Sequence, residues 1–315
     1  MSATRLRFAT RGSQLALAQT RIAAEALTAS GAAIEPVTVE ISTEGDRDRE
    51  TPLTVLGGRG VFVVAVEQAL LDGRADVAVH SLKDVPSALP PGLTLAAFLP
   101  REDARDALVA SRGRRLAELP PGARIGTSSR RRASLLRALR PDLVAAEIRG
   151  NVETRLRKVA DGEYDGVLLA AAGLRRLGRF EEVTQLFAEL EFPPAPGQGT
   201  IVLQCRDDDT ATIELLSAVD DAGSRVAAEA ERGFLAALGA GCSLPIGAFA
   251  QLSDGLLTLR GMIASDDGGT APPEGSTAPP AFGDVTGPPA EAAALGRGLA
   301  ERLMEGIAAQ PEHAG

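Results

Sequence analysis

Val77-Ala78-Val79-His80-Ser81-Leu82-Lys83-Asp84-Val85-Pro86 is an apolar run that ends in a pair of opposite charges. The apolar part predicts a short buried strand, and the polar part places an ammonium beside a carboxylate where that strand surfaces. Ligands of open parallel sheets bind beyond the carboxyl ends of the strands. Lys83 and Asp84 are therefore candidate site residues, and a salt bridge or a solvated turn at a strand end is the structural alternative.

Residues 1–204 repeat this order of a short apolar segment followed or preceded by a helical pattern. Such alternation is typical of parallel α/β units. Strands are predicted over 5–9, 37–42, 76–80, 124–126, 143–148, 166–170 and 200–204, and helices over 13–27, 61–71, 131–139 and 152–160.

The last third of the chain has a different pattern, with a helix predicted over 228–238. Strands over 248–252 and 256–263 are predicted to pair antiparallel, because Ser253-Asp254-Gly255 between them is a turn sequence. Apolar residues that recur every fourth position predict a closing amphipathic helix around Leu295, Leu299, Leu303 and Ile307.

Two stretches are interpreted as loops. Residues 44–60 are rich in charge, Gly and Pro, and loops of that length are often functional. Residues 265–289 are dominated by Gly, Pro, Ala and small polar residues, which predicts a flexible surface loop. The segment 192–199 contains three prolines and two glycines and is interpreted as a crossover between domains.

Composition limits the kinds of partner. A chain of 315 residues exceeds what one hydrophobic core usually serves, so we expect two or three domains. The net charge of −9 argues against general nucleic-acid binding, which depends on a basic surface. Arginines nevertheless concentrate between Arg124 and Arg157, and a local basic patch on an acidic chain suggests a small anionic ligand.

Several kinds of site and compartment are disfavoured. Two histidines, His80 and His313, leave little room for a zinc site of His and Cys or for a Ser-His-Asp triad, so we expect no metal. A phosphate-binding loop of the GxxxxGK[ST] type is absent from the sequence. Two cysteines without regular spacing, no signal peptide and no run of about 18 apolar residues predict a cytoplasmic protein that does not bind membrane.

Three predicted junctions from strand to helix carry arginine beside small polar residues. They are Arg11-Gly12-Ser13, Gly126-Thr127-Ser128-Ser129 before Arg130-Arg131-Arg132, and Arg149-Gly150-Asn151 with Arg155. Helix amino termini and guanidinium groups both bind carboxylate or phosphate, so the three together favour a cleft for a polyanion. The alternative is a set of hydroxyl or amide N-caps beside surface arginines.

The two cysteines have different settings. Cys242 lies in a Gly-rich turn before Pro245, where an accessible thiol could be an attachment point or a nucleophile. A small buried hydrophobe is the alternative, and it suits Cys205, which lies within an apolar segment.

A series of short motifs runs along nearly the whole chain. The motifs are Thr10-Arg11-Gly12-Ser13, Thr51-Pro52-Leu53, Gly57 to Val63, His80 to Pro86, Arg101-Glu102-Asp103, Gly126 to Ser129, Arg149 to Val152, Gly162 to Asp165, Ala172-Gly173-Leu174, Pro196 to Gly199 and the turn at Cys242. Some of them are weak individually, but their order is specific, and in this order they closely resemble the porphobilinogen deaminase (hydroxymethylbilane synthase) family.

The resemblance implies an α/β fold of three domains. The first two would resemble lobes of type II periplasmic binding proteins with mixed, mostly parallel sheets, and the third would be a small α/β domain with an antiparallel sheet. The implied boundaries are 1–99 plus 200–217 for domain 1, 100–199 for domain 2 and 218–315 for domain 3, which carries Cys242.

The resemblance also implies a transferase that joins four porphobilinogen molecules head to tail and releases four ammonia and hydroxymethylbilane, in tetrapyrrole biosynthesis. A dipyrromethane cofactor would be bound through a thioether to Cys242, and Asp84 would be the catalytic carboxylate. A monomer whose product passes to the next tetrapyrrole enzyme is expected. Further cofactor-binding residues would be Asp46, Lys83, Ser129, Arg131, Arg132, Arg149 and Arg155, and substrate-binding residues would be Arg11, Ser13, Phe62, Arg176 and Gln198.

Two other functions are compatible with part of the pattern. A two-lobed binding protein for a polycarboxylate would explain the arginine junctions and the α/β pattern, but not Cys242, Asp84 or a third domain. A phosphate-handling transferase would require the nucleotide loop that the sequence lacks.

Overall fold

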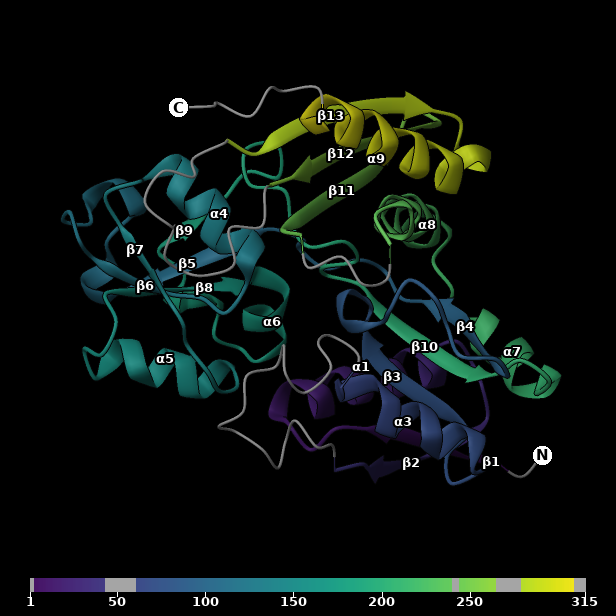
Figure 1. Ribbon diagram of the computed structural model, residues 1–315. Coiled ribbons are helices and arrows are strands. Elements are labelled where there is room, and N and C mark those ends of the chain that lie inside the picture. Colours follow the sequence, from purple (N-terminus) through teal and green to yellow (C-terminus); the bar gives the residue numbers. More distant parts are fainter. Residues whose placement is uncertain (1–2, 43–60, 240–243, 265–278, 309–315) are drawn as a thin grey trace. The chain divides into compact units, whose positions relative to one another are not determined.

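The computed structural model describes residues 3–42, 61–239, 244–264 and 279–308 (Figure 1). Within these residues the chain divides into two compact units. Unit 1 contains residues 1–102 and 199–225, and unit 2 contains residues 103–198 and 226–315. Each unit is built around a five-stranded sheet, and unit 2 also contains a three-stranded sheet.

The sheet of unit 1 has the strand order β2-β1-β3-β10-β4. Strands β1, β2 and β3 are parallel, and β10 runs antiparallel to both of its neighbours. In Figure 1, β10 lies between β3 and β4, although it is distant from both in sequence. The strands are β1 (Thr4–Thr10), β2 (Ile34–Glu40), β3 (Val77–Ser81), β4 (Leu93–Phe98) and β10 (Ile201–Arg206).

Helices cover both faces of this sheet, because alternate residues of each strand point to opposite sides. Val77 and Val79 of β3 pack in one cluster with α1 (Gln14–Ala29) and α7 (Thr210–Ser217). Ala78, between them, packs in a second cluster with α3 (Val61–Leu71). The strand is therefore buried on both faces, as its continuous apolar run predicts.

The five-stranded sheet of unit 2 has the order β7-β6-β8-β5-β9. Strands β6, β7 and β8 are parallel, and β5 is antiparallel to β8 and β9. Leu135 and Leu136 of α4 pack on one face, and Leu156 and Val159 of α5 pack on the other with α6. The elements are β5 (Asp106–Ala110), β6 (Arg124–Gly126), β7 (Val144–Ala146), β8 (Gly166–Ala170), β9 (Gln185–Leu186), α4 (Arg130–Leu139), α5 (Val152–Ala160) and α6 (Ala171–Arg176).

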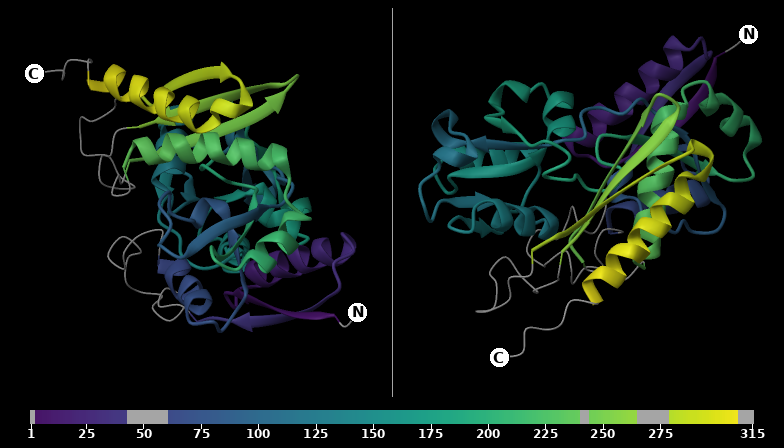
Figure 2. Two further views of the ribbon diagram at one scale, coloured as in Figure 1. Left: turned by 90° about the vertical axis from the view of Figure 1, so that its right-hand side faces the viewer. Right: turned by 90° about the horizontal axis from the view of Figure 1, so that it is seen from above.

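The three-stranded sheet is an antiparallel meander, β11-β12-β13. Two helices pack on the same face of it, because a Cβ added to Gly261 of β12 would meet both Phe234 of α8 and Leu299 of α9. Figure 2 shows α9 running along this sheet. The elements are β11 (Ile246–Ser253), β12 (Leu256–Ile263), β13 (Ala281–Gly287), α8 (Ala222–Ala237) and α9 (Ala292–Ala308).

The strand β13 corrects one prediction, since residues 265–289 were expected to form a loop. Residues 281–287 alternate between half-buried and exposed, and the strand pairs with β12 along its whole length. Its glycines are needed for packing, because a Cβ on Gly283 would meet Leu299 and Leu303 of α9. A composition typical of loops therefore conceals a strand whose small residues make room for a helix. Residues 265–278 lie outside the described part of the chain, as do 43–60, which include the whole of the predicted loop 44–60.

The predicted α/β class is confirmed, with mixed sheets rather than purely parallel ones. The antiparallel hairpin is also confirmed, with Asp254 and Gly255 at positive φ in its turn. Strands β4 and β5 were not predicted. The three-domain boundaries stay a prediction, because compactness alone groups residues 103–198 with 226–315.

Candidate active site

The predicted site residues of unit 1 lie at one edge of its sheet. Strands β1 and β3 are parallel neighbours, so the residues after their carboxyl ends share that edge. Arg11 and Ser13 follow β1, while Lys83 and Asp84 follow β3 in a short 3-10 turn (Leu82–Asp84). This is the position at which open parallel sheets bind ligands.

Hydrogen bonds connect the two junctions of this edge. Ser13 is the N-cap of α1 and accepts from the N–H of Ala16 at 3.2 Å. One turn further on, Gln19 Nε2 donates to the hydroxyl of Ser81 at 2.8 Å, which ties α1 to the end of β3. The side chain of Asp84 is half-buried, so it is accessible to a ligand.

A buried polar chain lies beneath this edge and is named here the His80 chain. His80 Nε2 lies 2.9 Å from Gln204 Oε1, and Gln204 Nε2 donates to Glu67 Oε1 at 2.8 Å. The three residues come from β3, β10 and α3, and all three are buried. Burial lowers the pKa of His80 to about 4, against the smaller opposing effect of its bond to Gln204. The imidazole is therefore neutral near pH 7 and donates from Nε2 to the amide oxygen.

The predicted residues of unit 2 likewise follow parallel strands. Ser129 is the N-cap of α4 after β6, and Asn151 is the N-cap of α5 after β7. The alternative interpretation, that these polar residues are helix N-caps, is therefore correct for Ser129 and Asn151. An N-cap residue at this edge is also compatible with a ligand site there. Gly126 permits a close approach here, because a Cβ would lie 2.9 Å from Ile148 Cδ1.

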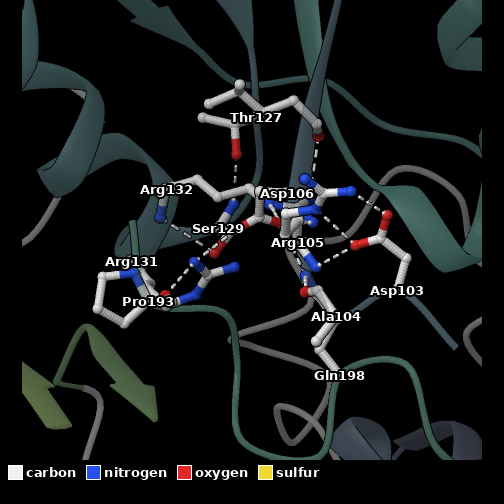
Figure 3. Close-up of polar contacts among 11 residues, drawn as sticks. Asp103, Ala104, Arg105, Asp106, Thr127, Ser129, Arg131, Arg132, Pro193 and Gln198 are labelled. Atoms are coloured by element: carbon white, nitrogen blue, oxygen red, sulfur yellow. Dashed lines mark hydrogen bonds and ion pairs between the residues drawn. The ribbon is translucent and has the colours of Figure 1, made fainter. Parts of the chain in front are cut away.

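Asp106 lies at the centre of the densest set of polar contacts (Figure 3). Its Oδ2 accepts from Arg131 NH1 at 2.6 Å. Its Oδ1 accepts from Arg132 Nε at 3.0 Å, from Arg132 NH2 at 2.7 Å and from Gln198 Nε2 at 2.9 Å. We name Asp106, Arg131, Arg132 and Gln198 the Asp106 cluster. All four are buried, and Asp106 itself is 0% exposed.

Each arginine of the Asp106 cluster also has a backbone acceptor. Arg131 NH1 donates to the carbonyl of Pro193 at 2.7 Å, and Arg132 NH1 donates to that of Leu168 at 2.9 Å. Burial alone would raise the pKa of Asp106, but the charges of Arg131 and Arg132 outweigh it and hold that pKa well below its usual range. The carboxylate is therefore ionised at every pH in which the protein is expected to function.

Further cations lie near the cluster. Arg155 Nε donates to the carbonyl of Gly150 at 2.8 Å, and Arg149 Nε lies 3.2 Å from Glu147 Oε1. The pKa of Arg155 is lowered to about 10 by burial and by the charges of Arg132 and Arg149. Depression of a guanidinium pKa by other guanidinium groups indicates a positive field, which an anionic ligand would relieve.

The remaining predicted residues are placed less completely. Arg176 ends α6 and is half-buried. Gln198 is 1% exposed and donates to the carbonyl of Ala104 at 2.8 Å as well as to Asp106. Phe62 is in α3, and its side chain is not described; Asp46 and Cys242 lie outside the described residues. The roles assigned to all of these residues stay predictions.

Sequence reasoning missed Asp106, although the arginines that it holds were predicted. The sequence does contain a signal for Asp106, because this carboxylate comes directly before the apolar run Ala107-Leu108-Val109. Asp84, by contrast, comes after an apolar run. A carboxylate that begins a buried strand requires cationic partners. Arg130-Arg131-Arg132 is one such group, although Arg105, Arg112, Arg114 and Arg115 lie nearer in the sequence.

Chemically, the edge in unit 2 suits a ligand with several carboxylates, because its buried guanidinium groups are oriented by a carboxylate and by carbonyl oxygens. The edge in unit 1, taken by itself, has a half-buried carboxylate beside a lysine. Arginine binds carboxylates with paired, oriented hydrogen bonds. Among the described residues, no group of three or more His, Cys, Asp and Glu side chains could hold a metal ion. No helix in the described ranges has the length and apolar character needed to cross a membrane.

Comparison with known proteins gives consistent matches along the chain. Residues 6–214 match the family model "Porphobilinogen deaminase, dipyromethane cofactor binding domain", and residues 226–305 match "Porphobilinogen deaminase, C-terminal domain". The porphobilinogen deaminase of Roseiflexus sp. (strain RS-1) is 51% identical over 82% of this chain and 86% of its own length. That of Syntrophotalea carbinolica is 45% identical over 99% and 98%. A periplasmic binding protein of Salmonella typhimurium covers 69% of this chain and 92% of its own, with 12% identity and a TM-score of 0.38.

Proposed function

Because the chain belongs to the porphobilinogen deaminase family, we propose that Asp84 is its catalytic carboxylate and that Cys242 attaches its dipyrromethane cofactor. The family establishes the reaction. The enzyme is a transferase that condenses four porphobilinogen molecules into hydroxymethylbilane with release of four ammonia, in tetrapyrrole biosynthesis. The roles of this chain's own residues in binding the cofactor, binding the substrate and catalysing the reaction are proposed below.

The described cations fit a cofactor of this kind. A dipyrromethane made from two porphobilinogen units carries acetate and propionate groups, and Arg131, Arg132, Arg149 and Arg155 are chemically suited to carboxylates. Lys83 and Ser129 would assist, one as a cation and the other through its hydroxyl and helix amino terminus. When bound, the cofactor supplies the pyrrole end to which the first substrate is joined. Asp46 is proposed as a further contact.

The observation that carries this assignment is the gathering of arginines where α4 and α5 follow the parallel strands of unit 2, with Arg131 and Arg132 buried and oriented by hydrogen bonds. Burial, and then the charges of Arg132 and Arg149, lower the pKa of Arg155, and an anion at this edge would favour its charged form. A charge-assisted hydrogen bond contributes roughly 1.5 to 3 kcal/mol, so several would hold a polycarboxylate firmly.

Asp84 is proposed to act on the substrate rather than to hold it. Loss of ammonia from porphobilinogen leaves an electron-poor azafulvene, and a carboxylate nearby stabilises its positive charge and accepts or returns the pyrrole N–H proton. Its place after β3 in a half-buried turn supports this role, because it combines ligand access with partial exclusion of water. Arg11, Ser13, Phe62, Arg176 and Gln198 are proposed to bind the substrate.

We further propose that the enzyme is a cytoplasmic monomer. Two cysteines without a disulfide framework support a reducing compartment. Hydroxymethylbilane is a reactive linear product, so the proposed partner is the next enzyme of tetrapyrrole synthesis.

Intact mass under denaturing conditions tests the cofactor assignment. We expect the purified wild-type chain to exceed its sequence mass by two condensed pyrrole units and Cys242→Ser to match its sequence mass. A Cys242→Ser chain with the same excess would move the attachment to another residue. A wild type that stays unmodified after incubation with porphobilinogen would contradict the proposed attachment altogether.

A further inference from the structure

The two arginines of the Asp106 cluster share one buried support. Arg131 is fixed between Asp106 Oδ2 and the carbonyl of Pro193, and Arg132 is fixed between Asp106 Oδ1 and the carbonyl of Leu168. Each guanidinium is therefore held at two points, and Asp106 is the point common to both. A planar cation held at two points has a defined orientation.

Asp106 is itself held in place by the fold. Its backbone carbonyl accepts from the N–H of Phe187 at 3.0 Å, where the start of β5 meets the end of β9. Its Oδ1 accepts a third hydrogen bond from Gln198 Nε2, and Gln198 is anchored in turn to the carbonyl of Ala104. The carboxylate is therefore a rigid reference, since it sits in a strand and is bonded from three side chains.

The presence of a carboxylate among cations that would bind carboxylates needs a reason. If Asp106 only neutralised the arginines, it would weaken their attraction for an anion. The cluster nevertheless stays positive, because it contains two arginines and only one carboxylate. Orientation is thus the property that Asp106 adds while the positive charge of the site persists.

We propose that Asp106 is a positioning residue, which sets the orientation of Arg131 and Arg132 for carboxylate groups of the bound pyrroles. The proposal rests on the proposed function, because it requires that these arginines receive the carboxylates. Asp106 does not touch the ligand in this role. It acts through the two arginines, as a buried carboxylate orients a histidine ligand at a metal site.

The test measures cofactor loading rather than turnover. Full-length chain is produced in cells that make no porphobilinogen and is then incubated with porphobilinogen, and the loaded fraction is followed by intact mass. Asp106→Asn is compared with wild type and with Asp76→Asn. Asp76 is a matched control, since it accepts three hydrogen bonds from Arg7 and lies at the start of β3, away from the carboxyl edge.

We expect Asp106→Asn to raise the porphobilinogen concentration for half-maximal loading by about tenfold or more, the loss typical when a supporting partner is removed. The loading rate at saturating porphobilinogen should change less, because the attachment chemistry at Cys242 is untouched. Asp76→Asn should load like wild type. Equal half-saturation in Asp106→Asn and wild type would overturn the proposal, and so would an equal defect in Asp76→Asn.

A second comparison separates action through the arginines from a general loss of structure. In an Arg132→Met background, Asp106→Asn should raise half-saturation by only about threefold, because half of what Asp106 holds is already gone. The double variant also restores the net charge that the cluster has in wild type, which keeps the comparison usable if Asp106→Asn alone does not fold. No further change in the double variant, or the full tenfold in both backgrounds, would contradict the proposal. A wild type that never loads would contradict the proposed function itself.

Discussion

The two five-stranded sheets of the molecule share one strand order and differ in the polar side chain that each buries. Each has three parallel strands in the order second, first, third, followed by an inserted antiparallel strand and by an edge strand that runs in the same direction as the first three. The inserted strand is β10 in unit 1 and β5 in unit 2 (Figure 1). It carries Gln204 in the first case and Asp106 in the second.

The position of that side chain along the sheet accounts for the difference. Gln204 is opposite Ala78 in the middle of β3, where its partners His80 and Glu67 are also interior. Asp106 is opposite Ala170 at the carboxyl end of β8, the edge at which ligands of such sheets bind. A polar residue further inside the sheet serves the fold, whereas Asp106, at the carboxyl edge, holds two arginines that we propose bind a ligand.

Asp84→Asn should have the largest effect of the changes that follow from this comparison. We expect turnover to fall by about 100- to 10,000-fold, the usual contribution of a general acid or base. The free energy of unfolding should change by only about 0.5 kcal/mol, because the side chain is half-buried and its loss empties no core position. Steady-state assays of ammonia release and urea unfolding measure the two quantities. Activity like that of wild type would contradict the catalytic role of Asp84.

Asp106→Asn should be the most destabilising change in either sheet. It leaves two buried guanidinium groups without their shared carboxylate, and breaking a buried ion pair from one side costs about 3 to 5 kcal/mol. Urea unfolding followed by circular dichroism gives the change. A loss below about 1 kcal/mol, the value for exposed ion pairs, would show that the cluster is not desolvated in solution.

The His80 chain should make unit 1 sensitive to acid in a range where the Asp106 cluster is not. Folded His80 has a pKa of about 4, below its ordinary value of 6.5, so the unfolded chain binds a proton first as the pH falls. Its contribution is fully present above pH 6.5 and is lost between pH 6.5 and 4, for a total of about 3 kcal/mol.

The measurement is the free energy of unfolding as a function of pH, for wild type and for His80→Gln. The difference between the two curves isolates His80 from the other titrating groups, and it should slope between pH 6.5 and 4 and be flat above. Asp106, whose pKa is held below its usual range, loses its contribution only below about pH 4. A flat difference curve throughout would mean that His80 is hydrated in the folded protein.

Gln204→Leu should have a smaller effect than Asp106→Asn, although both residues lie on the inserted strand of their sheet. It leaves His80 Nε2 and Glu67 Oε1 without their shared amide, and buried polar atoms left unpaired cost about 1 to 3 kcal/mol. Gln251→Leu on β11 is the control, because Gln251 is exposed and its replacement should change stability by only about 0.5 kcal/mol. An equal loss of unfolding free energy in Gln204→Leu and Asp106→Asn would contradict the expectation that the ionic Asp106 cluster contributes more to stability than the His80 chain.

Cys205→Ala should have the smallest effect, because it makes β10 match β5, which has Ala110 at the equivalent register. Cys205 is 0% exposed, and burial raises its thiol pKa to about 11, so it acts as a small apolar side chain. Its loss should cost about 1 kcal/mol in urea unfolding, near the value of one buried methylene group. Rapid reaction of this thiol with a maleimide in the native protein would contradict that interpretation.

The parts of the fold that the sequence predicts are those with strong periodicity. The run Val77 to His80 is buried on both faces and is found as β3, and the fourth-residue repeat from Leu295 is found as α9. Strand β5 was not predicted because it begins with a charge, and β13 was not predicted because two of its seven residues are glycines that make room for α9. In both, a tertiary contact sets the residue type, and local propensity cannot show it.

Two properties of the candidate site were predictable from the sequence: the types of its residues and their location where a strand is followed by a helix. The positions of Ser13, Ser129 and Asn151 as N-caps follow from local sequence. That Arg131 and Arg132 share Asp106 does not, because the acid and the arginines are about 25 residues apart and meet only when β5 enters the sheet beside β8. Local sequence identifies the functional groups, and pairing between distant strands determines what holds them.

Because β10 lies between β3 and β4 in the sheet but follows both in the sequence, the sheet of unit 1 cannot be completed until late in synthesis. Roughly a hundred residues separate β4 from β10, which is about 5 to 20 s of translation, and until then β3 and β4 lack the strand that joins them. All five strands of the other sheet leave the ribosome during that interval, since β5 to β9 lie within residues 103–198. Of the two five-stranded sheets, the one begun first is therefore completed last, and the nascent chain carries its unpaired strand edges throughout that interval, edges at which aggregation can begin.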